Sequence, residues 1–387
     1  MGRNSRTCRR TVAALALGLA AIPGAMGVAL AAAPDGFLQG LRRHTMLSST
    51  VPGNGDQNPY AIAVAPVSAG KLQAGDVLVD NFNDRKNLQG LGTTIVDYRP
   101  AIGKLSLFAS LPRDLPHCPG GVGLTTAMAV LRSGWVIVGS LPSRDGTTAT
   151  KGQGCLIVLD SQGEVAGTIA GPQIDGPWGN MAEIDHGATA TLFVSNVGFG
   201  VGAPLDDTPV VHRANVVRLD LTIPSGKPPV LAGETVVADG FGAQADKGVF
   251  IIGPTGLALG ADGTLYVSDA IGNRIVAIPE AATRADSAGT GRAVTADGML
   301  QRPLALAMAP NGHLITTNGL NGQAVEIDPA DGRQIYARWL DTDKAQQPPG
   351  SGDLFGIAMT PSGDGFYYVE DEVNALVLAQ QLTEGAR

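Results

Sequence analysis

Charged and aromatic residues are both scarce in this chain of 387 residues. Charged side chains make up 16% of the sequence and aromatic side chains 5%, whereas 44% is apolar and 53 residues are glycine. Surface helices need a charged or polar outer face, and many glycines indicate many turns. The composition therefore predicts a turn-rich fold with little exposed helix and a large apolar core. After the N-terminal segment, no apolar run approaches the length needed to span a bilayer.

The N-terminal segment has the pattern of an export signal. Its positive region contains four arginines and no acid: Arg3, Arg6, Arg9 and Arg10. An alanine-rich apolar stretch follows, in which Ala29 and Ala31 form an A-x-A cleavage site. We predict that residues 1–31 are a cleaved signal peptide and that residues 32–43 are an N-terminal extension. The alternative is a membrane anchor, which Pro23 and the many alanines disfavour.

Cleavage of this signal implies an exported protein, periplasmic or secreted, without a membrane anchor. The paired Arg9 and Arg10 leave both the general and the twin-arginine export routes open. The net charge of the whole chain is −8, and it becomes more negative, near −12, when the signal is removed. Such a surface repels nucleic acid and anionic lipid. We therefore expect a monomer whose partner is a small organic ligand or another exported protein.

A repeated phrase dominates the rest of the chain, and it is clearest in "PTGLALGADGTLYVSDAIGNRIVAI", residues 254–278. Alternating apolar residues, Gly/Asp turns and β-branched residues are the signature of short antiparallel strands. Six copies are recognisable, and they begin at Asn58, Leu124, Gly176, Pro254, Arg302 and Leu354. Repeats of about 50 residues built from short strands indicate propeller blades or solenoid turns. Solenoid turns are usually shorter and lack a regular fourth strand, so the pattern favours a propeller.

The sequence also predicts how the ring closes. The last copy lacks a fourth strand, and the stretch from His44 to Val51 has the layout of the strand that is missing. We predict an all-β, six-bladed β-propeller over residues 44–381, closed by this N-terminal outer strand, with a C-terminal tail at residues 382–387. A ring closed in this way leaves no unpaired strand edge where the two ends of the chain meet.

The repeat resembles that of the NHL-repeat family of six-bladed propellers, which are gluconolactonase-like. The resemblance rests on Pro-x-Gly-Leu-Ala at 254–258, Asp-Gly-x-Leu-Tyr-Val-x-Asp at 262–269 and Asn-Arg-Ile-Val at 273–276. It covers nearly the whole mature chain. It implies the fold, but members of the family include lyases, lactone hydrolases and binding modules, so activity must be argued from the site.

Cysteine is also scarce, with three residues in all. Cys8 leaves with the signal, so Cys118 and Cys155 remain, and two thiols in an exported chain predict one disulfide. Cys118 precedes the inner strand of the second blade and Cys155 opens the third strand of that blade, so both lie on the same face. His117 and Cys118 as a metal or nucleophilic pair are the alternative, which is disfavoured because adjacent residues on a strand point apart.

The candidate ligand-binding residues lie at one mouth of the channel, where each inner strand begins and each second strand ends. The candidates are Tyr60, His117, Trp178, Asn180, Asn196, Thr255, Asp269, Asn318 and Phe355. The inner strands are also opened by Thr125 and Leu304. Aromatic residues at a mouth suit a small organic ligand. The alternatives are structural: the aromatics pack between blades, and the Asp and Asn residues cap their own turns.

The resemblance also allows a comparison of metal ligands. Gluconolactonase-like propellers hold a divalent cation with a Glu, two Asn and an Asp at the mouth, the amidating lyases hold zinc with several His, and streptogramin lyases use a His. In this chain, Asn180 is the one residue that matches the gluconolactonase-like set, and His117 is the one histidine that lies just before an inner strand. The stretches that match the streptogramin-lyase motif read "GPWG" and "GPTG", without its histidine. We predict no metal site and leave the cofactor unknown. The favoured function is a small-ligand binding or protein-interaction module, and the alternative is a lactonase-like hydrolase or lyase; whether the chain is an enzyme stays open.

Overall fold

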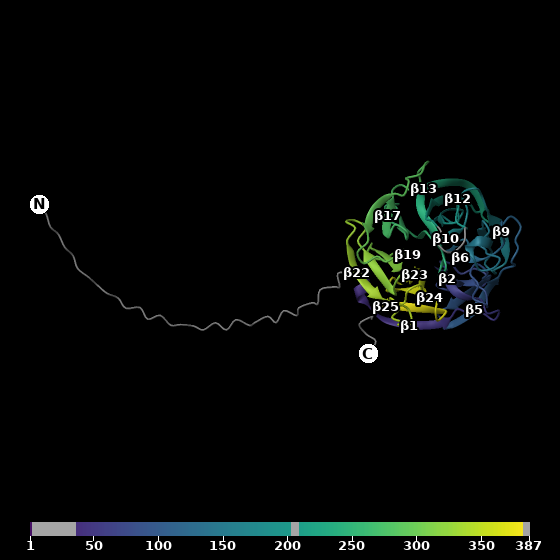
Figure 1. Cartoon of the computed structure of the whole chain (residues 1–387), viewed down its shortest axis with the longest axis horizontal. Helices are drawn as coiled ribbons and strands as arrows, with labels where there is room; N and C mark the ends of the chain where they lie inside the picture. The colour runs from purple at the N-terminus through teal and green to yellow at the C-terminus, as the bar shows by residue number, and fades with distance from the viewer. Residues whose placement is uncertain (2–35, 203–208, 382–387) are drawn as a thin grey trace. The chain divides into compact units, whose positions relative to one another are not determined.

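Six antiparallel sheets form a ring in the computed structural model, which describes Met1 and residues 36–202 and 209–381 (Figure 1). The predicted all-β, six-bladed propeller is therefore confirmed. Residues 2–31 of the predicted signal peptide and the predicted C-terminal tail lie outside the described residues. No helix among the described residues is long and apolar enough to cross a membrane.

The first three blades follow one another along the chain. The first consists of β2 (Gln57–Val64), β3 (Val77–Asn83), β4 (Thr94–Arg99) and β5 (Lys104–Ser110). The second consists of β6 (Leu124–Val130), β7 (Val136–Ser140), β8 (Cys155–Leu159) and β9 (Val165–Ile169), with the short 3-10 helix η1 (Thr148–Thr150) before β8. The third has a fifth strand and consists of β10 (Pro177–Asp185), β11 (Thr189–Asn196), β12 (Val211–Thr222), β13 (Val230–Asp246) and β14 (Phe250–Ile252).

The last three blades are more regular. The fourth consists of β15 (Pro254–Leu259), β16 (Leu265–Asp269), β17 (Arg274–Ile278) and β18 (Arg292–Ala296). The fifth consists of β19 (Pro303–Met308), β20 (Leu314–Asn318), β21 (Gln323–Ile327) and β22 (Gln334–Trp339). The sixth consists of β23 (Leu354–Met359), β24 (Gly365–Glu370), β25 (Ala375–Gln381) and, from the other end of the chain, β1 (Leu41–Ser49).

The fourth blade shows how the repeated phrase specifies a hairpin. Leu257 pairs with Val267 and Leu259 with Leu265, so the apolar residues of the phrase face each other across β15 and β16. The turn between them needs a left-handed residue, which Gly263 supplies with a φ of +81°. Asp262 fixes this turn by accepting a hydrogen bond from the Thr264 amide at 3.0 Å.

The ring closes through β1, which pairs antiparallel with β25, as in the pair Thr45 and Leu378. The strand begins at Leu41, three residues before the predicted start at His44. A short helix, α1 (Phe37–Gly40), precedes it. Residues 37–43 of the range that we assigned to an extension are therefore part of the folded ring.

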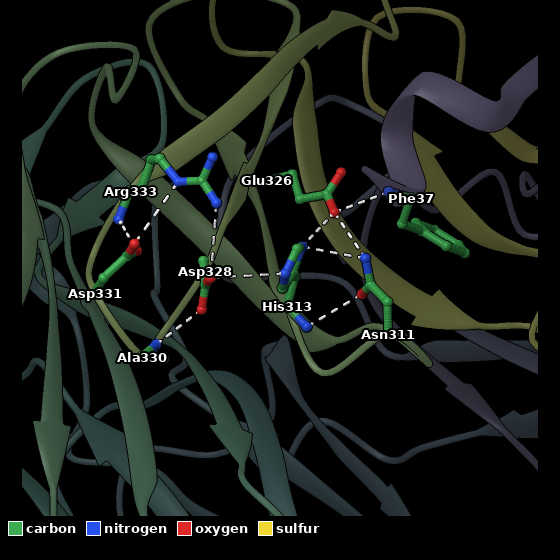
Figure 2. Close-up of polar contacts among 8 residues, drawn as sticks. All are labelled: Phe37, Asn311, His313, Glu326, Asp328, Ala330, Asp331 and Arg333. Carbon is green, nitrogen blue, oxygen red and sulfur yellow. Dashed lines mark hydrogen bonds and ion pairs between the residues drawn. The ribbon is translucent and has the colours of Figure 1, made fainter. Parts of the chain in front are cut away.

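A buried carboxylate anchors α1 to the fifth blade. Glu326 is fully buried, and its two oxygens accept hydrogen bonds from the amides of Phe37 and Leu38, both at 2.8 Å. Figure 2 shows that His313 and Asn311 approach the same carboxylate, at 2.7 Å from Nδ1 and 2.9 Å from Nδ2. These contacts satisfy the first amides of α1, which have no partner within the helix. They hold the start of the N-terminal strand against the fifth blade.

A disulfide joins Cys118 to Cys155, as predicted, with 5.2 Å between the Cα atoms. Both cysteines are buried and pack in the cluster of apolar side chains that lies between the first and second blades. The bond therefore ties the loop before β6 to the start of β8.

Candidate ligand site in the central channel

The six inner strands surround the central channel and all run in the same direction along it. Labels for five of them, β2, β6, β10, β19 and β23, surround the centre of the ring in Figure 1. The predicted mouth is where these strands begin, and the opposite mouth is where they end. The two halves of the channel differ sharply in what fills them.

A cluster of five aromatic rings fills the half where the inner strands begin. Tyr60 stacks between Phe82 and Phe355, with ring centroids 4.6 and 4.1 Å away. Trp178 stands edge-on to Tyr60 and Phe82 at 5.7 and 5.5 Å, and Phe250 contacts Phe82 at 5.4 Å. The most exposed of the five is Phe355, at 5%. We call these five residues the aromatic plug.

Three candidate ligand residues, Tyr60, Trp178 and Phe355, therefore do come together, but they pack against one another. The Tyr60 hydroxyl is buried and has no hydrogen-bond partner among the described residues. Burial raises the pKa of Tyr60 well above its usual value, and the nearby Asp371 and Asp246 add to this effect. Ligand binding by these three residues stays a prediction.

Two members of the plug were not among the candidates. Phe82 lies near the end of β3, and Phe250 begins β14, the extra strand of the third blade. The hairpin that carries Phe250 is held across the mouth by two contacts: Gln89 Nε2 donates to Gly248 O at 2.8 Å, and Arg302 pairs with Asp246 at 3.0 Å. The extended β13 is thus the element that brings Phe250 onto the channel.

The residues at this mouth do not fit a divalent cation. The positions that open the inner strands hold aromatic, hydroxyl or aliphatic side chains: Tyr60, Thr125, Trp178, Thr255, Leu304 and Phe355. Hard cations require several oxygen ligands, mostly carboxylates and carbonyls. Across the described residues, no three His, Cys, Asp or Glu side chains form a set that could hold a metal.

The opposite half of the channel contains a cavity of about 310 Å³. Its wall is formed by the last residues of all six inner strands and is mainly aliphatic, with Met128, Met181 and Met308 among the larger side chains. Only two polar side chains contribute to the lining, Asn180 and Glu183. Backbone groups of the strands line the cavity as well, and pockets that combine apolar side chains with a few polar groups are typical of small-molecule sites.

Asn180 crosses from the third blade to the fourth and fifth. Its Nδ2 donates to Leu257 O at 2.6 Å and to Leu306 O at 3.1 Å, and its Oδ1 accepts from Leu306 N at 3.2 Å. The inner strands have a free backbone edge on the channel, and Asn180 satisfies part of it. Of the candidates on the inner strands, Asn180 is the one that lines the cavity.

Glu183 was not a candidate. The Glu183 side chain is accessible to the solvent inside the channel. The inner strands surround it there, since it lies in the lining of the cavity. This enclosure raises the pKa of Glu183 to about 7; Asp185 raises it further and Arg132 opposes the change. A carboxyl with such a pKa is partly ionised at neutral pH, so it can act as donor or acceptor.

The candidates that close the second strands have structural partners. Asp269 pairs with Arg274 at 2.8 Å and accepts from the Gly272 amide. Asn318 Oδ1 accepts from Gln301 N at 3.0 Å, which holds the connection between two blades. Asn196 Nδ2 donates to Asn215 Oδ1 at 3.0 Å on the neighbouring strand. These contacts correspond to the capping alternative.

The two remaining candidates lie apart from the cavity lining. Thr255 is buried, and its hydroxyl donates to Gly253 O at 3.0 Å. His117 is exposed and adopts a left-handed backbone, with a φ of +61°, in the loop before β6. For both, a role in ligand binding stays a prediction.

No protein-family model and no curated protein matches this sequence. Solved structures do match over most of its length. A gluconolactonase from Xanthomonas campestris is 14% identical, with 88% of this chain and 90% of that chain covered and a TM-score of 0.53. The chain has the gluconolactonase-like six-bladed propeller fold.

Two further structures support the same fold. A luciferin-regenerating enzyme is 11% identical, with 88% and 95% of the two chains covered and a TM-score of 0.54. A virginiamycin B lyase from Staphylococcus aureus, solved with quinupristin, is 13% identical, with 88% and 100% covered and a TM-score of 0.50. At these identities the likeness concerns the propeller itself and not the activity.

Proposed function

We propose that this gluconolactonase-like propeller is an exported binding protein for a small organic ligand, and that the ligand enters the channel half opposite the aromatic plug. The observation that carries the proposal is the channel cavity, lined mostly by aliphatic side chains, into which Glu183 presents a carboxyl with a raised pKa. Apolar cavities with a few convergent polar groups and a perturbed titratable residue are the usual form of a ligand site.

The cavity indicates the ligand's chemistry. At about 310 Å³ it lies at the small end of the range for such sites, so the ligand is compact. The aliphatic and thioether wall favours an apolar body. The single carboxyl favours a hydrogen-bond donor, and above pH 7 it favours a cation. A small primary amine with an apolar body combines these features.

Matched ligands test this assignment. Amines, alcohols and carboxylates that share one apolar body can be titrated by calorimetry against the wild type and Glu183→Gln. We expect amines to bind most tightly, and their affinity to rise as the pH increases through 7 and Glu183 ionises. The substitution should weaken amine binding by roughly 10- to 100-fold, the usual effect of losing a charged hydrogen bond.

Glu164→Gln is the control, because Glu164 lies exposed on the second blade. It should leave amine binding unchanged. If carboxylates bind as well as amines, or if both variants behave like the wild type, the channel carboxyl does not select the ligand and the proposal is wrong.

A hydrolase or lyase acting on a small organic substrate is the second candidate, and one observation favours it. A carboxyl with a pKa of about 7 suits a general base or acid at neutral pH. Turnover of small esters or lactones that Glu183→Gln abolishes, with substrate binding retained, would support the enzyme over the binding protein.

A further inference from the structure

Side-chain hydroxyls connect neighbouring blades at one repeated position of the ring. In the fourth blade, the Ser268 hydroxyl accepts from the Gly256 amide at 2.6 Å and donates to Leu304 O, on the inner strand of the fifth blade. Ser268 lies directly before Asp269, the residue of β16 that pairs with Pro254 at the start of the inner strand. We call this place on the second strand of each blade the latch position.

The fifth and third blades have hydroxyls at the latch position as well. Thr317 Oγ1 donates to Phe355 O, on the inner strand of the sixth blade, at 3.3 Å. Ser195 Oγ donates to Trp178 O of its own blade at 2.6 Å and also approaches Thr255 O of the fourth blade, at 3.4 Å. In all three blades the acceptor on the next blade is the second residue of its inner strand.

Two other blades lack a side-chain donor at this position. In the second blade the residue is Gly139, and Thr125 replaces the missing hydroxyl, because its Oγ1 donates to Pro177 O of the third blade at 2.8 Å. A Cβ on Gly139 would lie 2.5 Å from this Oγ1, so glycine leaves the room for the bond. In the sixth blade the residue is Val369, which has no polar group. Four of the six boundaries between blades therefore contain a hydroxyl donor.

The first blade has a carboxyl at the latch position, that of Asp80. Its Oδ1 accepts from the Ala61 amide at 2.8 Å, the counterpart of the amide bond in the fourth blade. Leu78 lies two residues earlier, on the same face of β3, and packs in one apolar cluster with Leu124 of β6. Asp80 therefore faces the inner strand of the second blade, whose second residue is Thr125.

The second oxygen of this carboxyl is unsatisfied. Asp80 is fully buried, and its Oδ2 has no hydrogen-bond partner among the described residues. Burial raises the pKa of Asp80 well above its usual value, although the bond from the Ala61 amide opposes the rise. A protonated carboxyl supplies one O–H donor, whereas an ionised one only accepts. Oδ2 can therefore take the role of the hydroxyls in the other blades only when it carries a proton.

Among the described residues, no cation pairs with Asp80. Strands β2, β4 and β6 pack against β3. Their ionisable side chains are Tyr60, Asp97, Tyr98 and Arg99. Arg99, the one cation of this set, pairs with Asp76 and Asp97 instead. An ionised Asp80 would thus be buried without a counter-charge, which costs more than keeping the proton.

We propose that Asp80 keeps its proton at neutral pH and donates a hydrogen bond to Thr125 O, and that loss of this proton at alkaline pH loosens the boundary between the first and second blades. Thr125 lies where the pairing of β6 with β7 shifts, as Leu304 and Phe355 do on their own inner strands. After ionisation two acceptors would face each other in a buried site, and one of them must then reach water. The competing explanation is an ionised carboxylate that accepts from a buried water.

Infrared difference spectra detect the proton directly, because a protonated carboxyl has a C=O stretch apart from the carboxylate and amide bands. Spectra of the wild type and Asp80→Asn at pH 7 should differ by one protonated carboxyl. Glu164→Gln is the matched control, since Glu164 is exposed on the second blade, and its difference spectrum should contain carboxylate bands only. A carboxylate difference for Asp80→Asn would overturn the proposal and support the buried water.

Urea midpoints test the linkage between this proton and folding. Asp80→Asn preserves the shape of the side chain and offers Nδ2 as a donor that does not titrate. The native wild type binds a proton that the unfolded chain loses above about pH 4, so the wild type alone loses this contribution as the pH rises. The midpoint of Asp80→Asn minus that of the wild type should therefore grow from pH 5 upward. A difference that is constant from pH 5 to pH 9 would refute the proposal.

Hydrogen exchange locates the effect in the ring. Asp80→Leu has a similar volume but no donor, so exchange at residues 124–128 should be on the order of tenfold faster than in Asp80→Asn. Ser268→Ala is the matched control at the next boundary of this kind: it should speed exchange at residues 303–308 by a ratio that does not change with pH, since a hydroxyl does not titrate. Equal exchange in the two Asp80 variants would show that no hydrogen bond crosses the boundary between the first and second blades. If Asp80→Leu does not fold, the infrared and urea comparisons with Asp80→Asn decide the question.

Discussion

Replacing Trp178 by alanine should destabilise the ring without unfolding it at room temperature. Trp178 is 3% exposed and stands edge-on to Tyr60 and Phe82. Truncating a buried tryptophan removes its apolar contacts and leaves a cavity that neighbours fill only in part, at a cost of about 3–5 kcal/mol. The rigid inner strands around the plug limit such relaxation, which favours the upper end of this range.

This free energy can be converted into a melting temperature. Unfolding entropy is about 2.1 cal/mol/K per residue, so a ring of about 340 residues gives roughly 0.7 kcal/mol/K. The expected fall in melting temperature is therefore about 4–7 °C. Circular dichroism and urea denaturation both measure it, and the urea m-value should stay unchanged because the same surface is exposed on unfolding.

Trp339→Ala is the matched control, because Trp339 is 42% exposed on β22. It should cost less than about 1 kcal/mol, as surface substitutions usually do. If Trp178→Ala melts within 1 °C of the wild type, the aromatic plug is not close-packed and the mouth where the inner strands begin must be reconsidered as a ligand site.

Three further predictions follow from single features of the ring. Replacing Cys118 and Cys155 by serine should lower the free energy of unfolding by about 3–4 kcal/mol, because the disulfide closes a 37-residue separation; an unchanged urea midpoint would contradict this. Burial, with help from Asp76, raises the pKa of Asp97 to about 7 against the partial opposition of Arg99. Between about pH 4 and 7 the folded carboxyl therefore holds a proton that the unfolded one has lost, so the wild type loses stability as the pH rises through this window. Asp97→Asn should be more stable than the wild type at pH 8, by up to about 4 kcal/mol, with no gain near pH 4; equal urea midpoints at pH 8 would refute this. Glu326→Ala should remove the acceptors of the α1 amides, so we expect it to lower the free energy of unfolding by at least about 2 kcal/mol and to speed hydrogen exchange at residues 37–41. Exchange at the wild-type rate would show that the carboxylate does not anchor α1.

The blades, the closure and the disulfide could be predicted because they depend on local signals. Strand alternation and Gly/Asp turns recur within each repeat, and the strand missing from the last copy could be matched to the segment after His44. Cys118 and Cys155 flank strands of one blade, so their proximity follows from the blade itself. None of these inferences needed the position of a distant side chain.

The channel could not be predicted in the same way, because its contents come from several blades at once. In β10 the register shifts between Trp178 and Ala182. The strict alternation of strand faces is therefore broken at Asn180, and it could not predict that Glu183 lies on the channel. Phe250 reaches the plug with a φ of +71°, a conformation that sequence propensities do not anticipate for phenylalanine.

The pairing of β1 with β25 constrains the order in which the molecule can be assembled. Thr45 and Leu378 are partners across 333 positions of the chain. At about 5–20 residues per second, a ribosome needs roughly 17–67 s to synthesise the chain between them, and β1 has no partner strand during that time. Bringing such distant segments together also costs about 5 kcal/mol of chain entropy, which the other five blades lower by forming first and shortening the gap. We therefore expect the sixth blade to be the last to form. Until β25 is released and pairs with β1, a nascent or truncated chain exposes the unpaired backbone edge of β1 to chaperones.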